Sequence, residues 1–505
     1  MRRIDSCVPS TTKSASTARP GPAVGALIRA TFSDLLANGQ AVGRVNGVVV
    51  FAWGPLPGER ASLRVTQVKP KYVVADVVEI ESSSELRVTP FCGVFGVCGG
   101  CQVQHLSYPG QLAWKEQLVR SALRRIGGLA GVRVARTVGM EWPRAYRNKM
   151  SLVAQARETT TVGFYQARSH ALVPIDACPI VLPQLNATIP NLIAASRESQ
   201  TAPAFEGVKH VIVRAGAASG QSVVSLTTER GSAAIANSGR ALAQRLPGAV
   251  GVSNSFEPRS ANAVMGRRIA HVWGAREMEE TIEGVRFRVS AASFFQINSE
   301  MVGRIFRFMA PGLKTPRRIV DLYCGAGTFA IYFATRGAHV VGIEENEAAI
   351  REARANAALN GVEDSAKFLV GRVEGSLGSR EGRAAVAAAE IIFLDPPRKG
   401  SDERTLDAIA EAHVPNVWYL SCNPATLARD LARLVGHGYV IGIVQPFDMF
   451  PQTGHVETLV TLYRRAHLKL DLPEAEATEW SRYTPTWPSD DRYAEHDYPA
   501  FVEQE

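Results

Sequence analysis

Residues 391–398 read Ile-Ile-Phe-Leu-Asp-Pro-Pro-Arg, four apolar residues followed by an acid and two prolines. A short, wholly apolar run is typical of a strand that is buried on both faces. The prolines end the strand, fix the path of the loop and direct backbone carbonyls into the space beyond it. We therefore expect Asp395 at the carboxyl end of a buried strand, beside a ligand cleft. A simple strand-terminating Pro-Pro turn is the alternative.

A glycine-rich loop lies upstream of this stretch. Residues 319–323 (Ile-Val-Asp-Leu-Tyr) predict a second buried strand, and residues 324–328 (Cys-Gly-Ala-Gly-Thr) lead from it directly into a helix. Glycines at such a turn let a ligand approach the backbone. The next strand, 339–343, ends in Glu344, where a carboxylate can accept hydrogen bonds from ribose hydroxyls. The spacing Gly-x-Gly-x-x-Ala in this loop also leaves an NAD site open.

The rhythm of strand, glycine loop, helix and strand repeats from Arg317 onward, which predicts a doubly wound parallel α/β sheet. A strand that ends in Asp-Pro-Pro resembles a motif of S-adenosylmethionine-dependent methyltransferases, and NAD enzymes have no use for it. We therefore expect a Rossmann-like class I methyltransferase domain over residues 291–466.

A cysteine follows the next predicted strand, 417–420, in the sequence Ser-Cys-Asn-Pro. At the carboxyl end of a strand in an open α/β sheet, Cys422 would lie in the ligand crevice, where a thiolate can act as a nucleophile. An inert core cysteine is the alternative.

The pairing of a methyl donor with a cysteine suggests attack on a pyrimidine. Carbon 5 of uracil is a poor nucleophile, and addition of a thiolate at carbon 6 makes it enolate-like. A base must later remove the proton from carbon 5 so that the cysteine can leave. The candidate base is Glu457, in a predicted loop just ahead of the last strand, and His455 is a weaker rival.

Charge is distributed unevenly along the 505 residues, whose net charge is +8. The densest basic stretch runs from Lys115 to Lys149 and includes a predicted helix over residues 109–126. On that helix Lys115 and three arginines fall outside the apolar stripe formed by Leu112, Val119 and their neighbours. This pattern favours a phosphate-rich partner, with a solvated helix face as the alternative. The candidate phosphate contacts are Arg124, Arg125, Arg147 and Lys149.

Composition excludes a membrane span, because no run of about 18 apolar residues occurs. Seven cysteines are too few and too irregularly spaced for a secreted disulfide scaffold, so we expect a soluble cytoplasmic protein. Residues 1–20 lack the apolar core of a secretory signal and are either an extension or an organelle address.

Three cysteines, Cys92, Cys98 and Cys101, share one glycine-rich loop, and Cys178 is the nearest candidate for a fourth ligand. Three clustered thiolates plus one remote thiolate suit a [4Fe-4S] cluster, because one loop can hold three corners of the cube. Tetrahedral zinc, which more often uses two close pairs of ligands, is the alternative.

Short β-prone runs separated by turns occupy residues 25–82 and predict a small barrel of the oligonucleotide-binding type. The expected organisation is an extension (1–22), an RNA-binding barrel (23–84), a central α+β domain with the cysteines (85–290), the methyltransferase domain (291–466) and an acidic tail expected to be disordered (467–505).

Taken together, these features resemble the RNA uracil-5-methyltransferase family, in particular the iron-sulfur members that carry an N-terminal TRAM domain and modify 23S ribosomal RNA. The matching stretches are residues 92–101, 146–149, 293–298, 321–328, 395–400, 421–430 and 450–457.

The resemblance implies a role for each matching site residue. It makes Cys422 the nucleophile and Glu457 the base that abstracts the proton. It places S-adenosylmethionine at Gln296, Tyr323, Thr328, Glu344 and Asp395, and the cluster on Cys92, Cys98, Cys101 and Cys178. Two features depart from the family pattern: residues 371–374 read Gly-Arg-Val-Glu where an acid or amide usually lies near the adenine, and the extension beyond Leu462 has no counterpart.

We therefore expect a monomeric enzyme that methylates carbon 5 of a uridine in ribosomal RNA after the base leaves its stack. Three alternatives remain. The substrate is transfer RNA, the target is cytosine, or the protein binds RNA without turnover. Cytosine enzymes typically have a second cysteine after the Asp-Pro-Pro-type turn, where this chain has Arg398.

Overall fold

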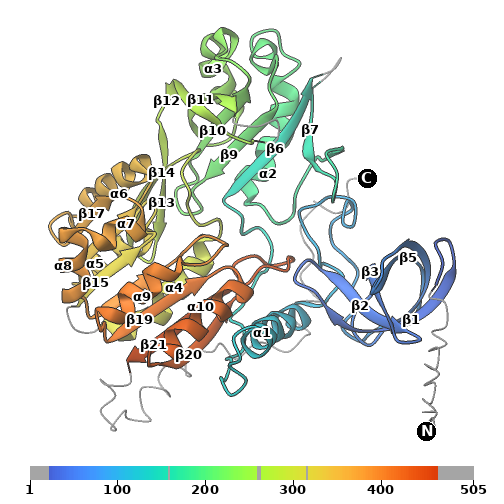
Figure 1. Cartoon of the computed structure of the whole chain (residues 1–505). Helices are drawn as coiled ribbons and strands as arrows, with labels where there is room; N and C mark the ends of the chain where they lie inside the picture. The colour runs from blue at the N-terminus through green and yellow to red at the C-terminus, as the bar shows by residue number, and fades with distance from the viewer. Residues whose placement is uncertain (1–21, 157–159, 259–262, 314–316, 465–505) are drawn as a thin grey trace, which may run out of the picture. The chain divides into compact units, whose positions relative to one another are not determined.

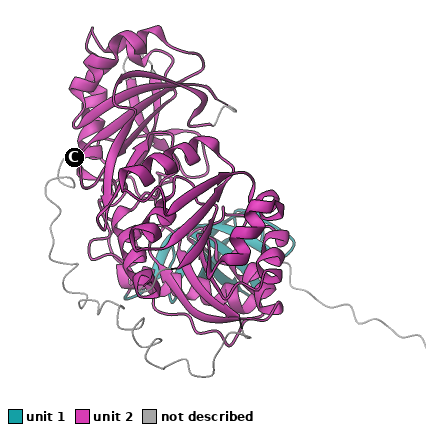
Figure 2. Cartoon of the chain, turned by 90° about the vertical axis from the view of Figure 1, so that its left-hand side faces the viewer, with its two compact units in different colours: residues 1–36, 40–85 teal, residues 37–39, 86–505 magenta. Residues whose placement is uncertain are grey.

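The structure is a computed structural model that describes residues 22–156, 160–258, 263–313 and 317–464. The chain forms two compact units. The first contains the residues up to 85 except 37–39 and is teal in Figure 2. The second contains residues 37–39 and the chain from 86 onward and is magenta. The expected N-terminal extension and acidic tail lie outside the described residues. No helix in the described ranges is long and apolar enough to cross a membrane.

The first unit is a five-stranded closed barrel with the strand order β1-β2-β3-β5-β4, as predicted (Figure 1). Its strands are β1 (Leu27–Leu35), β2 (Gln40–Val45), β3 (Val48–Trp53), β4 (Arg60–Val68) and β5 (Tyr72–Ser82). Alternate residues such as Ala30 and Phe32 point inward and are buried, while their neighbours face outward. This alternation, interrupted by turns, is what the sequence pattern had indicated.

The second unit begins with α1 (Tyr108–Arg125) and a seven-stranded sheet of order β12-β11-β10-β9-β6-β7-β8. Its strands are β6 (Lys149–Ala156), β7 (Thr160–Tyr165), β8 (Leu172–Pro174), β9 (His210–Ala215), β10 (Ser222–Thr228), β11 (Ala249–Pro258) and β12 (Gly266–Gly274). Helix α2 (Pro183–Ala195) packs against β7 and β9, and α3 (Ala233–Arg245) packs against β11 and β12 (Figure 1). The 3-10 turn η1 (Ala202–Phe205) contacts α3.

A two-stranded hairpin, β13 (Glu277–Ile282) and β14 (Val285–Ser290), follows this sheet. The hairpin packs against the helices of the C-terminal sheet rather than against α2 or α3. Its buried residues Met278, Phe287 and Val289 belong to the same apolar core as Phe306 and Phe329 of those helices. The loop after β14 therefore starts from a fixed position next to the C-terminal sheet.

The C-terminal sheet has the order β17-β16-β15-β18-β19-β21-β20. Its strands are β15 (Arg318–Leu322), β16 (His339–Glu344), β17 (Ala366–Val370), β18 (Ile391–Leu394), β19 (Asn416–Ser421), β20 (Tyr439–Phe447) and β21 (Glu457–Arg464). The helices are α4 (Ser299–Met309), α5 (Thr328–Thr335), α6 (Glu347–Leu359), α7 (Val373–Gly378), α8 (Arg380–Ala388), α9 (Glu403–Glu411) and α10 (Pro424–Gly436), with the 3-10 turn η2 (Ala310–Leu313) after α4.

The prediction of a parallel sheet is wrong for one strand, β21. Strands β15 to β19 are parallel, but β21 runs antiparallel to both β19 and β20. Helix α10 returns the chain so that β20 has the direction of β19, and β21 then reverses and inserts between them. Because β21 is antiparallel, it begins at the edge where the parallel strands end.

Helix α1 lies against α10, and this contact corrects one prediction about the basic stretch. Leu112, Val119 and Leu123 are buried as expected, but Lys115 is buried too and forms an ion pair with Asp448. Ile126, the last residue of the predicted helix, lies just past the end of the observed helix and is exposed. Lys115 therefore cannot serve as a surface contact for phosphate.

Candidate active site

A cleft of about 1030 Å³ lies in the second unit, at the carboxyl ends of β15, β16, β18 and β19. This edge of an open α/β sheet is where such folds bind ligands. All seven residues predicted for catalysis or donor binding line the cleft: Gln296, Tyr323, Thr328, Glu344, Asp395, Cys422 and Glu457. Residues of β10, β11 and β12 form part of its wall, so the cleft extends beyond the C-terminal sheet.

Cys422 and Glu457 come together because of the antiparallel strand. Ser421 at the end of β19 pairs with Thr458 of β21. Because the two strands are antiparallel, Cys422, which follows Ser421, and Glu457, which precedes Thr458, lie at the same edge of the sheet. The prediction that Glu457 lies in a loop is wrong: it is the first residue of β21 and its exposed fraction is 4%. Burial raises the pKa of Cys422 to about 12, with further contributions from the carboxyl groups of Glu457 and Asp395.

Two carboxyl groups share this part of the cleft. Burial raises the pKa of Asp395 to about 7, although its hydrogen bond from Gln296 Nε2 (3.4 Å) opposes the shift. Burial, and then the charge of Asp395, raises the pKa of Glu457 above its ordinary value. Glu457 Oε2 has no hydrogen-bond partner within the described residues. A raised pKa means that the ionised carboxylate binds a proton more tightly, which suits a proton-accepting base.

His455 is a weaker candidate for the base. Burial, together with the positive charge of Arg398, lowers its pKa to about 4. Its ring nitrogen Nε2 lies 3.4 Å from a guanidinium nitrogen of Arg398. A group with so low a pKa is a poor proton acceptor at neutral pH.

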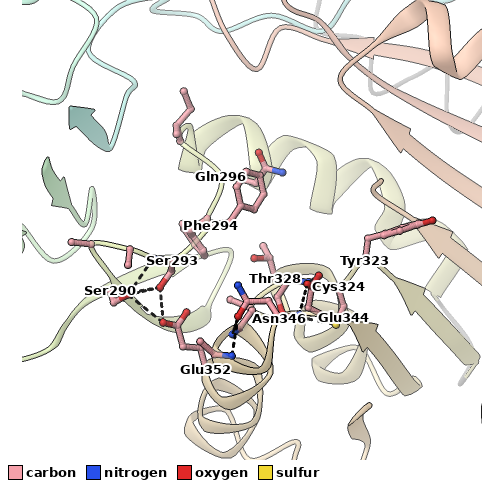
Figure 3. A pocket seen from close by; sticks show the side chains of 18 of the residues that line it. Ser290, Ser293, Phe294, Gln296, Tyr323, Cys324, Thr328, Glu344, Asn346 and Glu352 are labelled. Atoms are coloured by element: carbon pink, nitrogen blue, oxygen red, sulfur yellow. Dashed lines mark hydrogen bonds between the residues drawn. The ribbon is translucent and has the colours of Figure 1, made fainter. Parts of the chain in front are cut away.

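The glycine loop lines another part of the cleft, and Figure 3 shows the labelled side chains beside it. Gly325 and Gly327 have φ angles of +54° and +81°, which glycine adopts without strain. The Gly325 N–H donates to the Glu344 carboxylate (3.3 Å). Tyr323 has φ of +66°, which is uncommon outside glycine, and its hydroxyl lies 3.2 Å from Ser401 Oγ. Such strain is often found at ligand sites.

Asp321 was not assigned a role from the sequence. It lies at the end of β15, its exposed fraction is 1%, and neither of its carboxylate oxygens has a partner in the described part of the chain. Burial and the charge of Asp395 raise its pKa. The sequence did offer a signal for this residue, an acid inside an apolar strand. Burial of a charged side chain costs free energy unless a partner or a ligand compensates the charge.

The loop between β14 and α4 carries Gln296 and is held by a polar network that the sequence did not predict. Glu352 of α6 accepts hydrogen bonds from Ser290 (3.2 Å) and Ser293 (2.6 Å), visible at the lower left of Figure 3. Arg214 of β9 is buried and donates to the Ser293 carbonyl (2.9 Å). The partners are separated by dozens of residues, so no local pattern indicates them.

Comparison with known proteins identifies the chain. A protein-family model described as tRNA (Uracil-5-)-methyltransferase matches residues 276–465, and one described as TRAM domain matches residues 23–78. An uncharacterized RNA methyltransferase of Thermosynechococcus vestitus is 37% identical, over 87% of this chain and 98% of the relative. One of Listeria monocytogenes is 36% identical, over 86% and 97%. The chain belongs to the RNA (uracil-5-)-methyltransferase family.

A solved structure agrees with this assignment. The Pyrococcus abyssi tRNA (uracil-54, C5)-methyltransferase, in complex with S-adenosyl-L-homocysteine, is 28% identical. It matches with a TM-score of 0.68 over 86% of this chain and all of that one. The chain is an S-adenosylmethionine-dependent RNA (uracil-5-)-methyltransferase. NAD chemistry, cytosine as the target and a non-catalytic role are thereby set aside.

Cys92, Cys98, Cys101 and Cys178 of this RNA (uracil-5-)-methyltransferase are free thiols. They lie near one another, as shown by the effect of the Cys92 charge on the pKa of each of the other three. Burial raises the pKa of Cys101 to about 12 and that of Cys178 to about 11. The positive charge of Arg147 opposes the shift at both residues. Within the described residues no group of three or more His, Cys, Asp or Glu side chains is placed to hold a metal ion. The thiols are thus gathered, but not around a single point.

The predicted RNA contacts of the methyltransferase fall in different places. Arg147 lines the cleft, whereas Arg124 and Arg125 are exposed at the end of α1. Lys149 is half-buried at the start of β6, and burial together with the charge of Arg214 lowers its pKa to about 8. They do not form one patch, and their contact with RNA stays a prediction.

Proposed function

We propose that this enzyme methylates carbon 5 of a uridine in ribosomal RNA as a monomer, with Cys422 as the nucleophile and Glu457 as the base. One observation carries the assignment of roles: the end of β19 and the start of β21 meet at the ligand edge, with a thiol on one and a buried carboxyl group on the other.

The reaction then proceeds in two stages. The Cys422 thiol releases its proton to water, and the resulting thiolate adds to carbon 6 of the uracil and pushes electrons toward carbon 5 and the carbonyl at carbon 4. Carbon 5 forms a bond to the methyl carbon of the sulfonium donor, whose sulfur leaves with the bonding pair. Glu457 then accepts the proton from carbon 5, and the bond between sulfur and carbon 6 breaks as the ring double bond returns.

The acidic half of the cleft suits a positively charged methyl donor. Asp321, Glu344 and Asp395 line it, and Asp321 has no partner for its buried carboxylate among the described residues. A sulfonium cation nearby would favour their ionised forms. We assign Glu344 to the ribose hydroxyls, because it follows the second strand, and Gln296 and Tyr323 to the rest of the donor with Thr328.

We further propose that Cys92, Cys98, Cys101 and Cys178 hold a [4Fe-4S] cluster. A tetrahedral zinc ion with zinc–sulfur bonds of about 2.3 Å needs thiolates about 3.8 Å apart. A cubane accepts wider spacing, since each thiolate binds a different iron. One loop carries three of the four thiols and Cys178 comes near them, which suits the corners of a cubane. When bound, the cluster would tie the loop of residues 92–101 to Cys178.

Transfer RNA is the second candidate substrate, and one observation favours it. The solved structure with a TM-score of 0.68 is that of a tRNA (uracil-54, C5)-methyltransferase. Ribosomal RNA is our first choice because of the cysteine loop, through which the sequence resembles the iron-sulfur members of the family.

Mapping of 5-methyluridine decides between the two substrates. Ribosomal and transfer RNA from cells with and without this gene are digested separately and their nucleosides are quantified by mass spectrometry. We expect one 5-methyluridine to disappear from ribosomal RNA and to return with the wild-type gene but not with Cys422→Ala. Loss from transfer RNA alone would assign the second substrate, and loss from neither would refute the proposal.

A further inference from the structure

The cleft has a volume at the upper end of the range for pockets that hold one small ligand. Pockets for single small molecules measure about 300–1,000 Å³, and this one reaches about 1030 Å³ because it continues along β10, β11 and β12. None of the residues there takes part in the chemistry described above. The part of the cleft along β10, β11 and β12 can therefore hold a ligand other than the methyl donor and the target base.

Strand β12 is the edge strand of its sheet, and its two faces differ. Met265, Ile269 and His271 line the cleft, and because side chains alternate along a strand, Arg267 lies on the same face. The other face points to the α3 side, where Val272 approaches Gly239 of that helix. Arg268 belongs to this second face, and its guanidinium lies 5.1 Å from the ring of Phe256.

The arginines on the two faces also differ in their partners. Arg268 forms an ion pair with Glu257 (3.2 Å). Arg276 lies in the turn that leads to β13 and also lines the cleft. Both Arg267 and Arg276 are exposed, and neither forms an ion pair with another described residue. Two unpaired guanidinium groups on one rim favour an anionic partner, although Glu277 also lies on this rim.

The rim combines these charges with apolar surface. Ile269 is 48% exposed on the same face of β12, beside His271. A single strand of RNA offers both partners, because its phosphates suit arginines and the faces of its unstacked bases suit apolar side chains. Charged residues on an edge strand also protect it from pairing with other strands, but that role does not require them to face a cleft.

We propose that the cleft-facing side of β12 and the turn after it bind the RNA strand that flanks the target uridine. Arg267 and Arg276 contact phosphates, and Ile269 and His271 lie against a neighbouring nucleotide. The inference rests on the proposed function, since the strand is placed by the uridine at Cys422. These contacts do not read sequence, so they act on any single-stranded RNA that reaches the site.

The test compares Arg267→Ala/Arg276→Ala with Arg268→Ala, which removes an arginine from the opposite face of the same strand. Binding of a fluorescent single-stranded oligouridylate is measured over a range of salt concentrations. We expect the double variant to bind about tenfold more weakly, and the slope of log affinity against log salt to fall by about 0.7 for each lost contact. Arg268→Ala should match the wild type in both. With cellular RNA as substrate, the double variant should show its loss in KM rather than in kcat.

Three results would overturn the inference: equal binding by the double variant and the wild type, equal losses in the double variant and Arg268→Ala, or no binding of oligouridylate by the wild type. Melting temperatures of all proteins check that the exposed substitutions leave the fold intact. Formation of 5-methyluridine by the wild type and Arg268→Ala tests the proposed function separately. If both methylate RNA while the double variant binds normally, the inference about β12 alone has failed.

Discussion

Lys115 of α1 and Asp448, which are 333 positions apart in the chain, form an ion pair in which both side chains are completely buried. Lys115 also donates a hydrogen bond to the Phe450 carbonyl (3.0 Å). Both contacts hold the segment between β20 and β21, which ends at Glu457. The pair therefore fixes the approach of the chain to the proposed base.

Loss of one partner in this pair should be costly. Lys115→Met leaves the Asp448 carboxylate buried without its counter-charge, so we expect the free energy of unfolding to fall by about 3–5 kcal/mol. The double variant with Asp448→Asn should recover most of this loss. Lys209→Met, which breaks the exposed pair with Glu229, should cost less than about 1 kcal/mol. Urea titrations compare the three, and equal losses in the two single variants would contradict the assignment.

The reactivity of Cys422 should depend on pH in a defined direction. Because burial raises its pKa to about 12, the thiol of the free enzyme is protonated at neutral pH. Alkylation by iodoacetamide, located by mass spectrometry, should be slow there and accelerate through the alkaline range. Glu457→Gln removes a carboxyl group that raises this pKa, so alkylation at a given alkaline pH should be faster. A rate that is already constant at neutral pH would show that the thiolate is stabilised.

The two-stage mechanism predicts unequal effects of its two residues. Glu457→Gln still permits addition and methyl transfer, but it lacks the base for elimination, so the enzyme should remain bound to methylated RNA through a Cys422 thioether. The measurement is a denaturation-resistant protein–RNA band labelled by the methyl donor. The band should be absent from Cys422→Ala and from the double variant. Methylation by Cys422→Ala at a near wild-type rate would rule out the covalent mechanism.

The exposed end of α1 is the place to test the basic stretch. Arg124→Ala/Arg125→Ala should weaken RNA binding and lower its salt slope by about 0.7–0.9 for each lost phosphate contact. Arg120→Ala, on the same helix but paired with Glu116, is the matched control and should have little effect. If the double variant binds RNA with the same affinity and salt slope as Arg120→Ala and the wild type, the arginines form only a solvated face.

The cysteine site predicts a coloured protein. After anaerobic purification we expect a brown enzyme with about four irons per chain, as a four-cysteine cubane requires. Cys178→Ser should lower the iron content and the absorbance together. A protein with stoichiometric zinc and no iron would refute the cluster.

Local patterns were sufficient for much of the fold. The apolar run before Asp395 and the glycine loop at 324–328 each combine a strand with its breaker, and both lie at strand ends in the structure. The helix predicted over 109–126 spans Tyr108–Arg125 for the same reason. Hydrophobic periodicity, turn residues and caps act over a few residues, so the sequence carries them directly.

The tertiary structure decided which side chains meet. Whether Glu457 lies in a solvated loop or beside Cys422 depends on the direction of β21, and Lys115 is buried only because α1 packs against α10 beside Asp448. The two faces of β12 likewise differ through their surroundings rather than through the pattern Arg-Arg-Ile. Burial and electrostatic interactions depend on which side chains are close in space. Residues hundreds of positions apart in the sequence come close only when the sheets and helices pack. The motifs therefore determined the chemistry available to this chain, and the packing determined where a proton, a methyl donor and an RNA strand can be held together.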